Sequence, residues 1–180
     1  MNPINELQEL TRLFPELEGR SLYLTAEHVA KETTPEPYRQ MLVHELHMTV
    51  TMEAYYKCAV DVIVVDQRFE NDLYLRCSLL RKHGTDKIVQ LGYVRFNFDY
   101  VTECVKQEIL GGEIPLGRVL IKHNVLRHVD LGAILRFTAG PGLVDHLQMT
   151  EGQVTFGRLA TIFCNGSPAI DLLEISAPLD

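Results

Sequence analysis

Two charged residues stand alone in apolar stretches of this sequence, and both have the chemistry to bind or process a small polar molecule. Arg76 lies in the middle of DLYLRCSLL, and Glu174 lies in IDLLEISAPL. A half-buried guanidinium needs an anion, which is either a carboxylate of the chain itself or a bound ligand. A carboxylate in such surroundings either meets an arginine or has a raised pKa. The sequence leaves both choices open.

A second candidate is the pair His44 and His47, whose H-x-x-H spacing puts both rings on one face of a helical turn. Zinc sites are built from such pairs, and a metal-assisted hydrolase would need one. The sequence offers no third ligand, so we favour ordinary packing or surface histidines and expect no metal. The four cysteines are far apart, without a C-x-x-C pair, which indicates free thiols: Cys58, Cys77, Cys104 and Cys164.

The composition indicates one domain spanning residues 1–180. The chain is 46% hydrophobic, which is enough for one well-filled core. Its formal net charge of −7 disfavours broad contact with nucleic acid, although one or two arginines in a closed pocket can still attract a small anion. The apolar stretches are shorter than the roughly 20 residues of a membrane helix, and the start lacks the pattern of a secretory signal. We therefore expect a cytoplasmic protein without membrane association.

The hydrophobic periodicity of the first third predicts a helix followed by strands. Residues 3–18 carry apolar residues at three- and four-residue steps, typical of an amphipathic helix that Pro15 ends or kinks. Residues 21–24 resemble a short strand, and residues 31–40 resemble a loop. From Met48 onward, MTVTMEAYYK and CAVDVIVVDQ alternate and contain β-branched residues, so we expect two strands that form a hairpin.

The rest of the chain predicts more strands in sequence, with two helices among them. The expected elements are strands 73–81 and 87–98 around the turn His83–Asp86, a helix from Thr102 to Gly111-Gly112, a helix 116–122 opened by Pro115, strands 129–137 and 154–163, the turn Cys164–Pro168, and strand 169–176. Because helices do not alternate with strands, the pattern indicates an α+β domain with an antiparallel sheet. No glycine-rich phosphate loop has the required spacing.

Four short motifs in the same order resemble the chorismate lyase family. They are Met48-Thr49, Leu73-Tyr74-Leu75-Arg76 with its return through Val89-Gln90-Leu91-Gly92-Tyr93, the P-L-G-x-x-L segment within Gly112–Leu120, and Leu172-Leu173-Glu174-Ile175 through Pro178-Leu179. The resemblance covers residues 41–179 and implies a chorismate lyase-like fold. Residues 1–40 show no comparable match, and we interpret them as a packing helix and a connector.

The resemblance also implies a role for each matching residue. Arg76 would bind the carboxylate of the substrate, and Glu174 would lie at the opposite end of a buried pocket. Substrate or product would also be bound by Met48, Thr49, Leu116 and Gly117, with residues 112–128 forming part of the cover. Where members of the ubiquinone pathway carry Gly-Arg, this chain has Gly92-Tyr93, with Arg95 two residues further on. Arg158 is then a candidate replacement cation, although an exposed arginine at a strand start fits the sequence equally well.

The resemblance implies a lyase that converts chorismate to 4-hydroxybenzoate and pyruvate. Arg76 would anchor the substrate, and Glu174 would assist the elimination as an acid or base. Neither a metal nor a cofactor is required, because the ring gains aromaticity when pyruvate leaves and preorganised binding supplies the catalysis. The alternative is a non-catalytic module of the same fold that binds and senses a small aromatic acid. The sequence does not indicate the hydroxybenzoate isomer or the oligomeric state.

Overall fold

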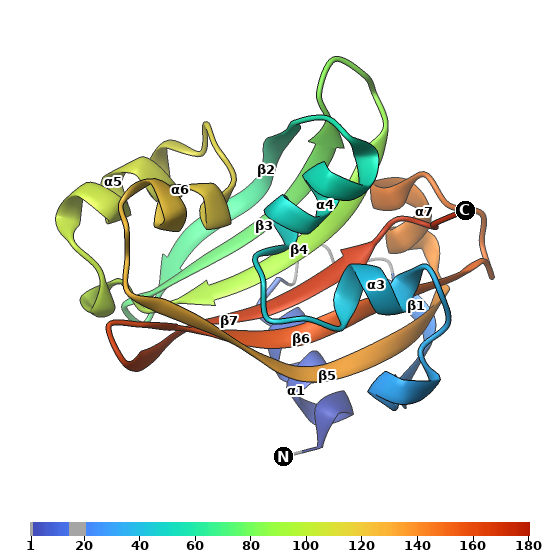
Figure 1. The fold of residues 1–180 in the computed structure, drawn as a ribbon. Helices are drawn as coiled ribbons and strands as arrows, with labels where there is room; N and C mark the ends of the chain where they lie inside the picture. Colours follow the sequence, from blue (N-terminus) through green and yellow to red (C-terminus); the bar gives the residue numbers. More distant parts are fainter. Residues whose placement is uncertain (1, 15–20) are drawn as a thin grey trace.

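One antiparallel sheet forms the frame of the molecule (Figure 1). The structure is a computed structural model and describes residues 2–14 and 21–180. Strands of the described chain lie in the order β1-β5-β6-β7-β4-β3-β2. They are β1 (Tyr23–Val29), β2 (Val60–Glu70), β3 (Leu73–Lys82), β4 (Ile88–Phe96), β5 (Arg127–Ala139), β6 (Val154–Cys164) and β7 (Ser167–Ser176). The expected α+β class with an antiparallel sheet is confirmed.

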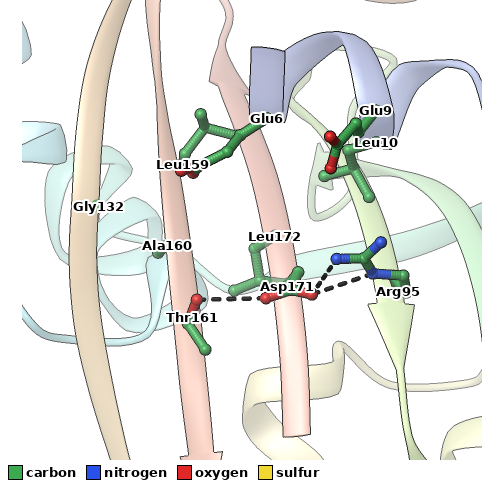
Figure 2. Close-up of a pocket in the computed structure, with 10 residues that line it drawn as sticks. All are labelled: Glu6, Glu9, Leu10, Arg95, Gly132, Leu159, Ala160, Thr161, Asp171 and Leu172. Carbon is green, nitrogen blue, oxygen red and sulfur yellow. Dashed lines mark hydrogen bonds and ion pairs between the residues drawn. The ribbon is translucent and has the colours of Figure 1, made fainter. Parts of the chain in front are cut away.

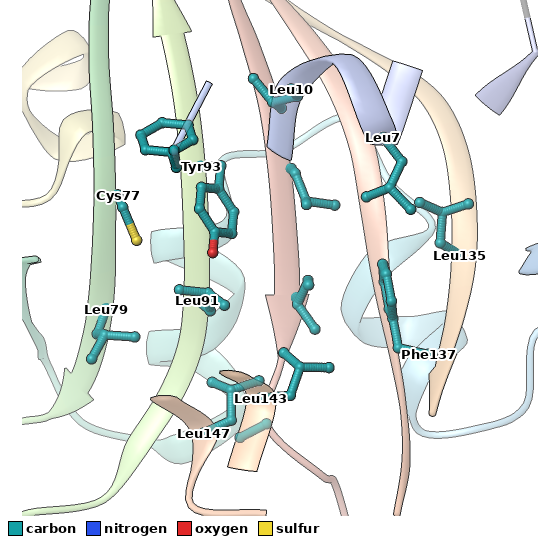
Figure 3. Close-up of a cluster of buried hydrophobic side chains, with 14 of the residues drawn as sticks. Leu7, Leu10, Cys77, Leu79, Leu91, Tyr93, Leu135, Phe137, Leu143 and Leu147 are labelled. Carbon is teal, nitrogen blue, oxygen red and sulfur yellow. The ribbon is translucent and has the colours of Figure 1, made fainter. Parts of the chain in front are cut away.

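Helices cover both faces of this sheet. The face that we call the α1/α7 face carries α1 (Pro3–Thr11) and α7 (Pro141–Leu147), and Figure 3 shows its core of buried apolar side chains. The opposite face, called the α4/α6 face, carries α3 (Tyr38–Leu42), α4 (Met48–Tyr56), α5 (Glu103–Gly111) and α6 (Leu116–Lys122). The described residues also form two 3-10 turns, η1 (Lys31–Thr33) and η2 (Phe98–Tyr100). No helix in the described part of the chain is both long and apolar enough to cross a membrane.

Strand β7 shows how alternation divides side chains between the two faces. Leu173 and Ile175 belong to the core of the α1/α7 face, together with Leu7 and Leu10 of α1. Leu172 packs instead with the apolar residues of α5 and α6 on the opposite face. Because successive side chains of a strand point to opposite faces, Glu174 lies on the same side as Leu172. The lone carboxylate therefore faces the α4/α6 side of the sheet.

Strand β2 forms one edge of the sheet and, among the strands that the structure describes, pairs with β3 alone. The pairing register shifts between Val64 and Asp66, so Val65 is an extra residue that forms a β-bulge. Val65 is also one of the exposed large hydrophobic residues.

The local predictions for the second half of the chain are confirmed. Strands β3 and β4 form the expected hairpin, and β5, β6 and β7 lie where alternation placed them. Helix α5 begins after Thr102 and ends at Gly112, whose φ of 65° is left-handed as expected for a glycine C-cap. Helix α6 follows Pro115 directly. Helix α7 was not expected.

The strand predicted from Met48 is wrong, because these residues form helix α4. The residues that α4 buries are Met48, Thr49 and Met52, which are three and four positions apart as on one helical face. Contacts on the α4/α6 face outweigh the modest β-propensity of T-V-T, which is strongly dependent on context. The expected hairpin partner of β2 is therefore absent, and β2 pairs with β3 instead.

The N-terminal region departs from the prediction in two ways. Helix α1 ends at Thr11 rather than at residue 18, and Pro15 lies outside the described residues. The strand-like patch extends to Val29 as β1, which pairs with β5 and forms the second edge of the sheet. Residues 1–40 are thus more than a helix and a connector, because they contribute a strand to the sheet.

Candidate functional site

A small cavity on the α4/α6 face brings together six of the seven residues predicted to form the site. Arg76, Met48, Thr49, Leu116, Gly117 and Glu174 all line it. The remaining lining residues are His47, Ser78, Leu80, Gln90, Gly92, Val94, Pro115, Ile162 and Leu172. Its volume is about 50 Å³. The sheet supplies the polar floor, and the first turns of α4 and α6 supply the cover.

The register of three neighbouring strands sets this floor. Gly92 of β4 lies between Ser78 of β3 and Glu174 of β7, and Arg76 is two residues before Ser78 on the same face. A Cβ built on Gly92 would meet its nearest protein atom, Nε2 of Gln90, only at 3.8 Å. The glycine is therefore not required by close packing, and its missing side chain leaves room above the middle of the floor.

Arg76 is buried without an anion. Arg76 is 2% exposed, and its Nη1 donates a long hydrogen bond of 3.4 Å to the carbonyl oxygen of Ile109. Its Nε has no hydrogen-bond partner, and no carboxylate of the described residues forms an ion pair with it. Burial lowers the pKa of Arg76, and interaction with Tyr74 opposes this shift. Because arginine stays protonated in proteins, the cavity holds an uncompensated positive charge.

Gln90 is the second polar residue with an unmatched atom in the lining. Its side chain is buried, and its Oε1 lacks a hydrogen-bond partner in the described part of the chain. Buried polar atoms without partners are few in folded proteins. Arg76 and Gln90 therefore give the cavity one cation and one acceptor that the protein does not satisfy by itself.

Glu174 meets an arginine, which was the first of the two alternatives for this carboxylate. Its Oε2 accepts a hydrogen bond of 2.7 Å from Nε of Arg158. Arg158 is 1% exposed and lies directly opposite Glu174 in the β6–β7 pairing. It is therefore not the exposed arginine at a strand start that we considered, and it is absent from the cavity lining. Its charge is matched by Glu174 rather than offered to a ligand.

His47 and Gly117 form the contact between the two covering helices. A Cβ on Gly117 would lie 3.1 Å from the His47 ring, so the glycine allows α6 to approach the histidine closely. Nε2 of His47 accepts a hydrogen bond of 2.8 Å from Nε of Arg127. Burial, followed by Arg127 and Arg158, lowers the pKa of His47 to about 4. The imidazole is therefore neutral near pH 7, and its proton is on Nδ1.

The two histidines of the H-x-x-H pair face different partners. Nε2 of His44 contacts the carbonyl oxygen of Met41 at 2.7 Å, whereas His47 contacts Arg127. Within residues 2–14 and 21–180, no group of three or more His, Cys, Asp or Glu side chains is placed to hold a metal ion.

Arg95, which follows Gly92-Tyr93 by two residues, points away from the cavity. Figure 2 shows it on the α1/α7 face, where it donates two hydrogen bonds of 3.0 and 2.6 Å to Oδ2 of Asp171. Thr161 donates to the other oxygen of this carboxylate. These residues line a separate pocket of about 260 Å³ beside α1. Tyr93 also packs in the core of this face. The cavity therefore receives no second cation from this part of β4.

Sequence reasoning missed Ser78, Gln90 and His47 as lining residues. A usable signal existed for Ser78, which is two positions from Arg76 and therefore on the same face of its strand. Gln90 has the same relation to Gly92 on β4. No comparable signal existed for His47, because its place depends on α4 being a helix.

Comparisons with known proteins establish the fold. The structure of PhnF from Mycobacterium smegmatis matches with a TM-score of 0.55 over 93% of both chains, at 10% sequence identity. YydK from Bacillus subtilis, described as a possible transcriptional regulator, matches with a TM-score of 0.49 and 10% identity over 66% of this chain and 57% of its own. The ligand-binding domain of a proposed GntR-family transcriptional regulator from Bordetella bronchiseptica matches with a TM-score of 0.46 and 10% identity, over 65% and 84%.

Sequence comparison adds no family assignment. No family model matches the chain, and no curated protein is significantly similar to it. The resemblance to chorismate lyases therefore stays a prediction.

The prediction of a lyase is wrong, because solved structures of similar fold are described as transcriptional regulators or their ligand-binding domains. Glu174, the expected acid or base, is held through one of its oxygens by Arg158 at 2.7 Å.

Proposed function

We propose that this protein is a non-catalytic module that binds a small carboxylic acid of the hydroxybenzoate class in the cavity beneath α4 and α6. The unpaired guanidinium of Arg76 carries the proposal. A buried charge without a partner is costly, and a bound carboxylate would offset that cost through paired, charge-assisted hydrogen bonds. The fold shared with PhnF is compatible with this function but does not imply it.

The rest of the lining suits an aromatic acid. Apolar side chains from both the cover and the sheet would contact a ring, and these are Met48, Val94, Leu116, Ile162 and Leu172. Polar groups are few and lie on particular walls, with Ser78 and Gln90 on the floor and Thr49 in the cover. An apolar pocket with a small number of placed polar groups is the usual form of a small-molecule site.

The cavity must widen to accept such a ligand. Its volume is about 50 Å³, whereas sites for small molecules are on the order of 300 Å³ or more. The sheet residues are fixed by strand pairing on both sides. We therefore expect α4 and α6 to move outward, and the contact between His47 and Gly117 to open, when a ligand enters.

Titration calorimetry with 4-hydroxybenzoate and with chorismate tests the proposal. We expect saturable binding of at least one of them at a single site, and recovery of the ligand unchanged. The neutral amide 4-hydroxybenzamide should not bind, because it lacks the charge that Arg76 requires. Arg76→Gln should weaken binding about 100-fold, since two hydrogen bonds to a charged group are lost.

Arg95→Gln is the matched control for this experiment. It removes an arginine from the neighbouring strand but from the opposite face of the sheet, so binding should be unchanged. Equal loss of affinity in both variants would contradict the assignment of the site. Release of pyruvate from chorismate by the purified protein would contradict the non-catalytic function.

A further inference from the structure

Arg158 joins the floor of the cavity to a surface segment. Its Nη1 donates to the carbonyl oxygen of His44 at 3.0 Å, and its Nη2 donates to that of Leu46 at 2.9 Å, while its Nε donates to Glu174. Arg158 is almost fully enclosed, so water cannot readily replace a partner that is lost. A displacement of the Glu174 carboxylate therefore alters the two hydrogen bonds that Arg158 donates to these carbonyl groups.

The segment that receives these bonds is residues 43–47, which link α3 to α4 without regular secondary structure. Within it, the amide of Leu46 donates to Nδ1 of His44 at 3.1 Å. The same ring nitrogen lies 3.3 Å from Nη1 of Arg158, and burial followed by Arg158 lowers the pKa of His44. His44 and His47, at either side of Leu46, are also held by Met41 and Arg127. Arg158 supplies the two bonds that reach the carbonyl groups of this segment from the interior of the protein.

The same segment touches both the cavity and the outside of the protein. It leads directly into His47, which lines the cavity, whereas Leu46 is 58% exposed. Glu45, Leu46 and His47 line an open groove of about 550 Å³, together with Val50, Ile121 and residues 124–129. A shift of the segment therefore changes the shape of a surface that other molecules can contact.

We propose that Arg158 is a positioning residue that couples occupancy of the cavity to the conformation of the 43–47 segment. This inference rests on the proposed function, and it states how ligand binding would change another part of the protein. Oε2 of Glu174 is bound to Arg158, and no hydrogen bond within the described chain engages Oε1. A ligand that contacts this carboxylate redirects it, and Arg158 then loosens or tightens its hold on His44 and Leu46.

Hydrogen–deuterium exchange of peptides covering residues 42–48 tests the coupling in the full chain. In ligand-free protein, Glu174→Gln should speed exchange of this segment about tenfold or more, because a bond between two charged groups is replaced by a weaker one. Asp171→Asn is the matched control, since it lies three residues away on the same strand but faces the opposite side of the sheet. It should leave exchange of the segment unchanged.

The wild-type protein gives an arm that needs no variant. Saturating 4-hydroxybenzoate, with binding shown by calorimetry, should change exchange of residues 43–47 at least several-fold. If the ligand binds and the segment does not respond, the coupling is refuted and the proposed function stands. If 4-hydroxybenzoate does not bind, the proposed function is wrong for this ligand. Independently of that result, unchanged exchange in Glu174→Gln would show that the Arg158–Glu174 ion pair does not control the conformation of the segment. Should this variant not fold, the wild-type arm decides.

Discussion

Replacing Arg76 with methionine should stabilise the ligand-free protein while removing its ability to bind a carboxylate. Arg76 is 2% exposed, and its guanidinium has no counterion among the described residues. Holding an ion in such surroundings costs several kcal/mol, whereas the long bond to Ile109 returns at most about 1 kcal/mol. Methionine is flexible and apolar, and it fills much of the same space. We expect a net gain of about 2 kcal/mol, or about 4–8 °C in Tm for a chain of this size.

Urea unfolding and calorimetric melting of wild type and Arg76→Met measure this gain. Arg158→Met serves as the opposite control, because Arg158 is equally buried but paired, and its loss leaves Glu174 without a partner. That variant should lose about 3–5 kcal/mol. A fall in stability of Arg76→Met, in the same direction as the control, would show that Arg76 has an internal structural partner. The observation that carries the proposed function would then be lost.

Three further predictions concern the floor, the sheet and pH. Gly92→Ala should fold with a stability gain of about 0.5 kcal/mol, as its Cβ meets nothing closer than 3.8 Å, yet it should weaken 4-hydroxybenzoate binding about tenfold by filling the space above the floor. Gly157→Ala should instead cost about 1–3 kcal/mol in urea unfolding, because its Cβ would lie 2.7 Å from the backbone oxygen of Glu174. Burial and then nearby arginines lower the pKa of His47 to about 4, so the unfolded chain takes up its proton first as pH falls. Stability should therefore be complete above about pH 6.5 and fall by about 3 kcal/mol toward pH 4, and His47→Gln should flatten this profile.

Much of the sheet could be predicted because its signals are local. Alternation located β3 to β7, and the turn between β6 and β7 was recognisable. Counting outward from the first pair of this hairpin, Cys164 and Ser167, would place Arg158 opposite Leu173. A register shift between Ile162 and Phe163 brings Arg158 opposite Glu174 instead, and the sequence does not indicate that shift.

The assembly of the cavity could not be predicted in the same way. Glu174 reaches the neighbourhood of Arg76 only because β7 inserts beside β4, although some 70 residues separate the two strands in sequence. The cover depends on α4, whose β-branched residues resemble a strand when read without their tertiary contacts. Family resemblance located six lining residues without this information. A resemblance transfers residue positions from proteins of related fold, so it does not require the packing to be worked out from the sequence.

The bulge in β2 has a consequence for how this protein behaves at high concentration. An exposed edge strand rich in valine and isoleucine is a template on which another chain can add a strand and start an aggregate. The extra residue at Val65 breaks the hydrogen-bond ladder in the middle of this edge, and the ion pairs Asp66–Arg68 and Asp61–Arg81 place charged side chains along the same strand. We expect deletion of Val65 to restore a continuous edge and to favour strand addition between copies of the chain.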